Sequence, residues 1–150
     1  MKHQHNLIMM LGYLMAFGGF TANVRAQSAE QKPVKHLVST YHVAPGQHLQ
    51  FLKWFAQQEA VDKEAGAPAT QWFAHQDGAS WDYIVIAVQP EAAEQEKIGK
   101  KFDKLAKKKG MATGMRASLE FRQFISSHTD TYVLGPFTAE ELVQEAEKRD

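Results

Sequence analysis

Arg122, His128 and Asp130 carry side chains suited to proton transfer. His128 and Asp130 are two residues apart in a predicted strand, so both point to the same face of the sheet. A carboxylate beside an imidazole can orient it as a general base, and an arginine can hold an anionic substrate. We therefore predict these three as candidate catalytic residues. The alternative, which we favour from the spacing, is a structural pair in which Arg122 and Asp130 fix a junction between a helix and the last strand.

Aromatic residues are concentrated between positions 51 and 83 and could line a pocket for an aromatic or lipid-like ligand. They are Phe51, Trp54, Phe55, Trp72, Phe73, Trp81 and Tyr83. The predicted ligand-binding residues are Tyr41, His42, Trp54, Trp72 and His75. The alternative is that the aromatic residues form the core and a dimer interface, which explains most of them.

Five histidines follow residue 26, namely His36, His42, His48, His75 and His128. His36 and His42 share one face of a predicted strand, and His75 lies on a neighbouring hairpin. No HxxxH or HExxH spacing forces them together, so we expect no metal site and no cofactor. The chain has no Cys, which excludes thiol nucleophiles, cysteine zinc sites and disulfides.

A strand at residues 80–89 positions these candidates. Its run Tyr83–Val88 contains only apolar and aromatic residues, with Asp77-Gly78 before it and Pro90 after it. Residues 71–75 are the predicted partner strand, joined to it by a loop at 76–79.

The other predicted elements follow from the spacing of apolar residues and from capping signals. A strand at 34–43 alternates between two faces: His36, Val38, Thr40 and His42 on one, and Leu37, Ser39, Tyr41 and Val43 on the other. A helix at 47–64 has an apolar stripe at Leu49, Leu52, Phe55, Ala56 and Ala60, widened by Phe51 and Trp54, and Gly66 and Pro68 end it. The order is completed by helices at 91–109 and 115–126 and by a strand at 128–134. A capping box at 138–141 then starts the last helix.

The helix at 91–109 contains seven lysines: Lys97, Lys100, Lys101, Lys104, Lys107, Lys108 and Lys109. A basic amphipathic helix can bind anionic lipid or phosphate. The alternative, which we favour, is a solvated face whose acids at the start and lysines at the end complement the helix dipole.

Residues 1–26 have the layout of a secretory signal: Lys2, an apolar stretch from Leu7 to Phe20, and the small residues Val24 and Ala26. Cleavage there predicts a periplasmic or secreted protein that keeps no membrane insertion, with a flexible leader at 27–33 and one domain at 34–150. The whole chain has 17 basic and 17 acidic residues. Cleavage removes Lys2 and Arg25 but no acid, so the cleaved protein would have 15 basic and 17 acidic residues. This near balance argues against nucleic-acid binding.

The order strand, helix, two strands, helices, strand, helix is the βαββαβ pattern of an α+β, ferredoxin-like sheet with its helices on one face. Over residues 34–137 it resembles the dimeric α+β barrel superfamily, in which two such sheets face each other in a homodimer. The resemblance implies a cavity for a small apolar ligand. Superfamily members include small monooxygenases and haem-degrading enzymes. The haem-degrading members use an Asn, Trp and His set, and no Asn follows residue 26.

Three functional hypotheses remain open from the sequence. The first is a homodimer that binds a small apolar or aromatic ligand. The second is a non-enzymatic envelope protein that contacts anionic surfaces through its lysine-rich helix. The third is a cofactor-independent, monooxygenase-like enzyme.

Overall fold

The strand β3 (Tyr83–Val88) is central in the computed structural model, which describes residues 32–149. It pairs antiparallel with β1 (Val34–Val43) on one side and with β2 (Gln71–Ala74) on the other. The edge strand β4 (Ile125–Gly135) pairs antiparallel with β1. The sheet order β2-β3-β1-β4 confirms the predicted ferredoxin-like α+β fold. The predicted signal at 1–26 lies outside the described residues.

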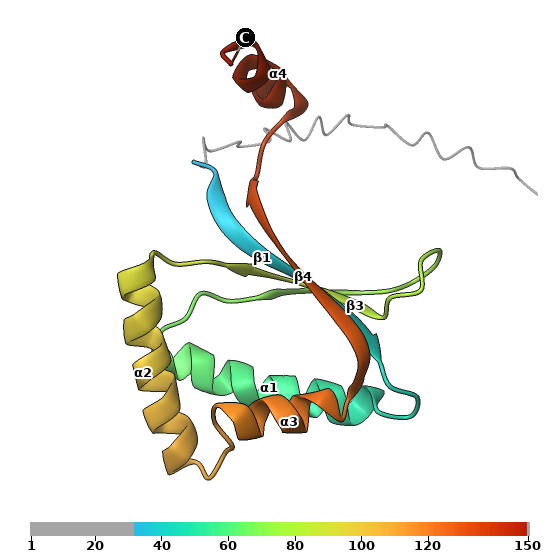
Figure 1. Cartoon of the computed structure of the whole chain (residues 1–150), viewed down its shortest axis with the longest axis vertical. Helices are drawn as coiled ribbons and strands as arrows, with labels where there is room; N and C mark the ends of the chain where they lie inside the picture. The colour runs from blue at the N-terminus through green and yellow to red at the C-terminus, as the bar shows by residue number, and fades with distance from the viewer. Residues whose placement is uncertain (1–31, 150) are drawn as a thin grey trace, which may run out of the picture. The chain divides into compact units, whose positions relative to one another are not determined.

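Three helices lie on one side of this sheet: α1 (His48–Ala65), α2 (Ala92–Lys108) and α3 (Met115–Arg122) (Figure 1). Tyr41, Val43 and Val85 point to this side and form a buried cluster with Phe51 of α1, which is fully buried. Burying an aromatic side chain of this size contributes about 2 kcal/mol. The aromatic residues of α1 therefore hold the helix against the sheet.

The opposite face of the sheet has no helix over it within residues 32–149. The strand register places Val38 beside Ile86, and His36 beside both Val88 and Val133, on this face. Phe73 is 48% exposed and Val133 is 40% exposed. We call this side of the sheet, opposite the three helices, the open face.

The predicted end of the third helix was wrong. The third helix ends at Arg122 and not at residue 126, because β4 begins at Ile125, which pairs with Val43. Ser126 Oγ also donates a hydrogen bond of 3.0 Å to the His42 carbonyl. A β-branched residue followed by two serines favours an extended strand over a helix.

The buried face of α1 also differs from the predicted stripe. Leu49 and Leu52 are exposed, whereas Phe51 and Val61 are buried. The larger aromatic surfaces of Phe51 and Phe55 determine which side of α1 packs on the sheet, since they gain more from burial than the leucines.

Two helix ends agree with the sequence prediction. Gly66 caps α1 with a positive φ of 96°, which favours glycine. Thr138 and Glu141 form the predicted capping box at the start of α4 (Ala139–Glu147). Among the described residues, no helix has the length and apolar content to cross a membrane.

Candidate functional site

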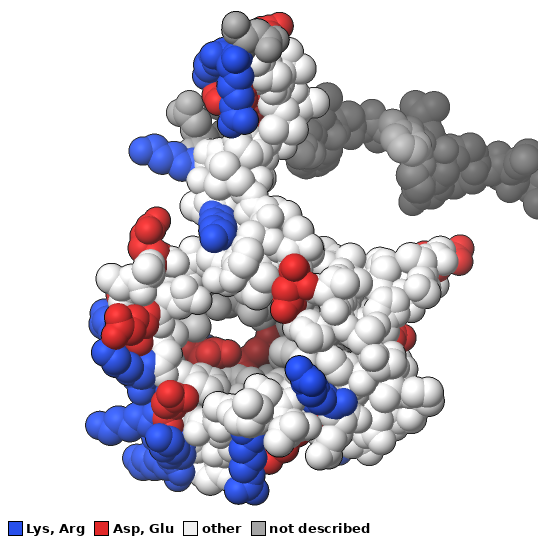
Figure 2. All heavy atoms as spheres, viewed as in Figure 1, with Lys and Arg blue, Asp and Glu red and all other residues white. Residues whose placement is uncertain are grey.

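A cleft opens between the sheet and the helices, with a volume of about 370 Å³. Its walls are aromatic and aliphatic: Trp54, Phe55, Trp72, Val85, Ile98 and Phe102. Figure 2 shows this side of the molecule hollowed, with acidic atoms inside the hollow. We call it the helix–sheet cleft.

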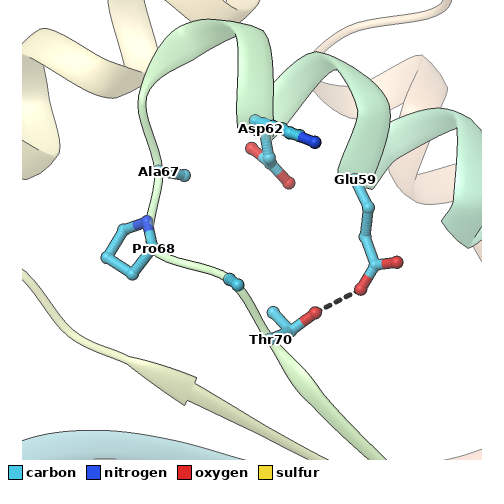
Figure 3. A pocket seen from close by; sticks show the side chains of 7 residues that line it. Glu59, Asp62, Ala67, Pro68 and Thr70 are labelled. Carbon is cyan, nitrogen blue, oxygen red and sulfur yellow. Dashed lines mark hydrogen bonds between the residues drawn. The ribbon is translucent and has the colours of Figure 1, made fainter.

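The polar part of the cleft comes from one face of α1. Gln58, Glu59 and Asp62 lie three, four and seven residues after Phe55, so the four share one face of α1, and all four line the cleft. Glu59 and Asp62 also line an adjoining pocket of about 320 Å³ between α1 and the loop at residues 66–70. In Figure 3 their side chains project from α1 toward this loop. Two carboxylates therefore lie side by side against an aromatic wall.

The Glu59 carboxylate is held in position by β2 and the residue before it. Its Oε1 accepts a hydrogen bond from Trp72 Nε1 at 2.6 Å and another from the Thr70 hydroxyl (Figure 3). Both donors are neutral, and no cation pairs with Glu59 or Asp62 within residues 32–149. Lys63 lines the adjoining pocket with these two acids but forms no ion pair with them, so neutral donors alone orient the Glu59 carboxylate.

Burial raises the pKa of Asp62, and the neighbouring Glu59 carboxylate raises it further. The negative charge of Glu59 disfavours ionisation of Asp62 because the site is partly desolvated. A ligand with an N–H or O–H donor or a positive charge would relieve this repulsion.

The predicted catalytic residues are brought together in part. His128 Nε2 lies 3.5 Å from Asp130 Oδ2, and Ser39 Oγ donates a 2.7 Å hydrogen bond to Asp130 Oδ1. Tyr41 stacks on the His128 ring at 6.0 Å between centroids. Arg122, at the end of α3, is exposed and forms none of the ion pairs found among the described residues, so the favoured Arg122–Asp130 pair is wrong.

Burial raises the pKa of the Tyr41 phenol, and the negative charge of Asp130 adds to the rise, while a hydrogen bond with Ser39 opposes it. The Tyr41 phenol is therefore protonated at neutral pH. Tyr41 also stacks on Trp72, at 6.5 Å between centroids, and so connects the His128–Asp130 pair to the wall of the helix–sheet cleft.

The predicted ligand-binding residues divide between three places. Trp54 and Trp72 line the helix–sheet cleft, and Tyr41 packs behind Trp72. His42 points to the open face, on the other side of the sheet. His75 lies beyond β2, with its ring 5.0 Å from that of Trp81 and its Nε2 buried without a hydrogen-bond partner among the described residues.

Sequence reasoning missed Glu59 and Asp62. The available signal was their spacing, because both continue the aromatic stripe of Phe51 and Phe55 by three or four residues at a time. Within residues 32–149, no group of three or more metal-ligating side chains comes together.

The seven lysines of the segment at 97–109 are partly paired with acids. Lys97 lies 3.3 Å from Glu94, and Lys100 lies 2.5 Å from Glu96. Lys109 lies 2.9 Å from Glu64 of α1. Acidic and basic side chains alternate along this region in Figure 2, so its surface is of mixed charge.

No family model matches the sequence, and no curated protein is similar to it in sequence. Solved structures show a likeness of fold. The element order and the strand order of this chain are those expected for a ferredoxin-like α+β sheet. An uncharacterised NIPSNAP domain protein from Burkholderia xenovorans is 12% identical, with a TM-score of 0.46, over 70% of this chain and 96% of that one.

Two further structures have similar values. SnoaB, a cofactor-independent oxygenase from Streptomyces nogalater, is 14% identical, with a TM-score of 0.48, over 74% of this chain and 100% of that one. A dimeric ferredoxin-like protein from an uncultured marine organism is 10% identical, with a TM-score of 0.45, over 73% of this chain and 92% of that one. At these identities no residue role is carried over to this chain.

Proposed function

We propose that this protein is a homodimer that binds a small aromatic molecule in the helix–sheet cleft. The observation that carries the proposal is the pairing of an aromatic wall, Trp54 and Trp72, with the oriented carboxylate of Glu59. Small-molecule sites are apolar clefts of this size with a few placed polar groups. The ligand we expect has an aromatic body and a cationic or hydrogen-bond-donating group that meets Glu59 and Asp62.

The homodimer part of the proposal rests on the open face. Phe73 and Ile84, which are paired across β2 and β3, lie on a sheet face with no covering helix within residues 32–149. A second copy that buries about 800 Å² on each partner would cover such a face, and twofold symmetry is the commonest arrangement. The helix–sheet cleft lies on the other side of the sheet and would stay accessible.

Calorimetric titration with three ligands that share one ring system tests the binding proposal. We expect 1-naphthylmethylamine to bind more tightly than 1-naphthalenemethanol, and 1-naphthoate to bind least. Glu59→Gln should weaken binding of the amine by about ten- to a hundredfold, since a charge-assisted contact contributes about 1.5–3 kcal/mol. Glu96→Gln, on the outer surface of α2, is the matched control and should change nothing. Equal affinity for the three ligands, or no heat with any of them, contradicts the proposal.

The two other functional hypotheses stay predictions. An enzymatic role would use the His128–Asp130 pair, whose Nε2 and Oδ2 atoms lie 3.5 Å apart. Contact of the lysine-rich helix with anionic lipid predicts liposome binding that weakens as salt rises. A periplasmic or secreted location is likewise proposed from residues 1–26 alone.

A further inference from the structure

The C-terminal helix α4 has an apolar stripe that nothing covers among the described residues. Ala139, Leu142, Val143 and Ala146 recur at steps of three and four and so share one side of the helix. Leu142 is 52% exposed and Val143 is 55% exposed. The other side carries the acids Glu140, Glu141, Glu145 and Glu147. A contiguous exposed apolar surface rimmed by polar residues is typical of an interaction site.

The open face contains a groove of about 520 Å³ with complementary character. Val38, Ile86, Val88 and Val133 form its apolar floor, and Lys32 and His36 supply cationic or donor groups. Among the residues that the structure describes, no carboxylate lines it. An apolar floor with basic residues and no acid suits an amphipathic helix whose polar side is acidic.

The groove and α4 belong to one continuous part of the chain. Val133, Gly135 and Pro136 line the groove, and only three residues separate the end of β4 at Gly135 from the start of α4 at Ala139. In the single chain α4 does not fill its own groove, because every residue of α4 is exposed. The open face therefore continues, through residues 136–138, into a helix that has no partner among the described residues.

We propose that α4 of each protomer docks into the open-face groove of a second copy, so that the two protomers exchange their C-terminal helices reciprocally. Leu142 and Val143 would lie on the floor formed by Ile86 and Val88, and the acids of α4 would lie near Lys32 and His36. This inference rests on the proposed homodimer. It adds a contact area beyond the sheet itself and fixes which end of each sheet meets the partner.

Cysteine cross-linking tests the exchange cleanly, since the chain has no Cys of its own. Leu142→Cys protein is mixed with Val88→Cys protein, the mixture is incubated to allow subunits to exchange, and disulfides are formed by mild oxidation. We expect a mixed dimer to form at least tenfold faster than with Lys101→Cys, an exposed site on α2, as the matched partner. Light scattering of the wild-type protein is measured in parallel.

The outcomes separate this inference from the homodimer proposal. A wild-type dimer without selective Leu142–Val88 cross-linking overturns the exchange and leaves the sheet dimer standing. A wild-type monomer overturns both. A monomeric disulfide in the doubly substituted chain, Leu142→Cys with Val88→Cys, would place α4 in its own groove and also overturns the exchange.

Discussion

Trp72 Nε1 donates a 2.6 Å hydrogen bond to Glu59 Oε1, which ties the middle of α1 to the edge strand β2. Thr70 donates to the same oxygen. The contact both orients a carboxylate in the helix–sheet cleft and fixes the indole that forms its wall. One hydrogen bond therefore serves the fold and the candidate site together.

Substitutions at Glu59 should separate its acceptor role from its charge. Glu59→Gln keeps a side-chain oxygen for Trp72 and Thr70, so we expect the free energy of unfolding to change by less than about 1 kcal/mol. Glu59→Ala leaves both donors without an acceptor and should cost about 2 kcal/mol. Urea unfolding followed by circular dichroism measures both. Equal losses for the two variants would show that the hydrogen bonds do not hold the cleft.

Asp62 should make stability depend on pH in a defined direction. Its raised pKa means that the folded state holds the proton more tightly than the unfolded state, so the ionised form costs stability at neutral pH. Asp62→Asn should therefore be more stable than wild type at pH 7. The difference should shrink as the pH falls through the raised pKa toward the ordinary value of 3.8.

Asp103→Asn provides the control for Asp62, because Asp103 is exposed on α2. It should show no such gain. Thermal unfolding of both variants between pH 4 and pH 8 measures the effect, and Glu59→Gln should reduce it by removing the second carboxylate. A stability difference for Asp62→Asn that grows as the pH falls would contradict the assignment.

The pKa of the Tyr41 phenol should respond to its two polar neighbours in opposite directions. Asp130→Asn removes a negative charge and should lower this pKa, whereas Ser39→Ala removes a hydrogen bond and should raise it. Ultraviolet titration, with Tyr41→Phe to identify the signal, measures both shifts. Thr129→Ala, on the opposite face of β4, should leave the titration unchanged. Shifts of the same sign in Asp130→Asn and Ser39→Ala would rule out this arrangement.

The capping box at the start of α4 should control the helix content of the C-terminus. Thr138→Ala removes the side-chain acceptor for the Glu141 N–H and should cost the helix about 1 kcal/mol. The Thr138 N–H also lowers the pKa of Glu141, so its contribution is present at neutral pH and disappears as the pH falls. Far-ultraviolet circular dichroism should show a loss of helix, and Lys148→Gln at the other end should show a smaller one. Unchanged helix content in Thr138→Ala would contradict the role of the cap.

The sequence predicted the sheet well because its strands have strong local signals. The bounds of β1 at Val34 and Val43 and the cap at Gly66 are as expected. The start of β4 could not be read locally, because the backbone of β1, distant in the sequence, pairs with Ile125. Tertiary pairing decided that segment against a short-range helical pattern.

The candidate site was predicted in its aromatic part and missed in its acidic part. Trp54 and Trp72 were identified by residue type, which a sequence displays directly. Glu59 and Asp62 were passed over because acids on a helix are usually solvated, and only the rotation of α1 set by Phe51 and Phe55 turns them toward the sheet. The predicted Arg122–Asp130 pair does not form, because Arg122 is exposed at the end of α3 and Asp130 accepts its hydrogen bond from Ser39 of β1.

A crystal structure of the protein with 1-naphthylmethylamine tests the central claim most directly. The account predicts electron density for the naphthyl ring between Trp54 and Trp72, with the amine nitrogen about 3 Å from a carboxylate oxygen of Glu59 or Asp62. Crystals of Glu59→Gln soaked at the same concentration should show weaker density. Density elsewhere on the surface, or an empty helix–sheet cleft at saturating ligand, would contradict it.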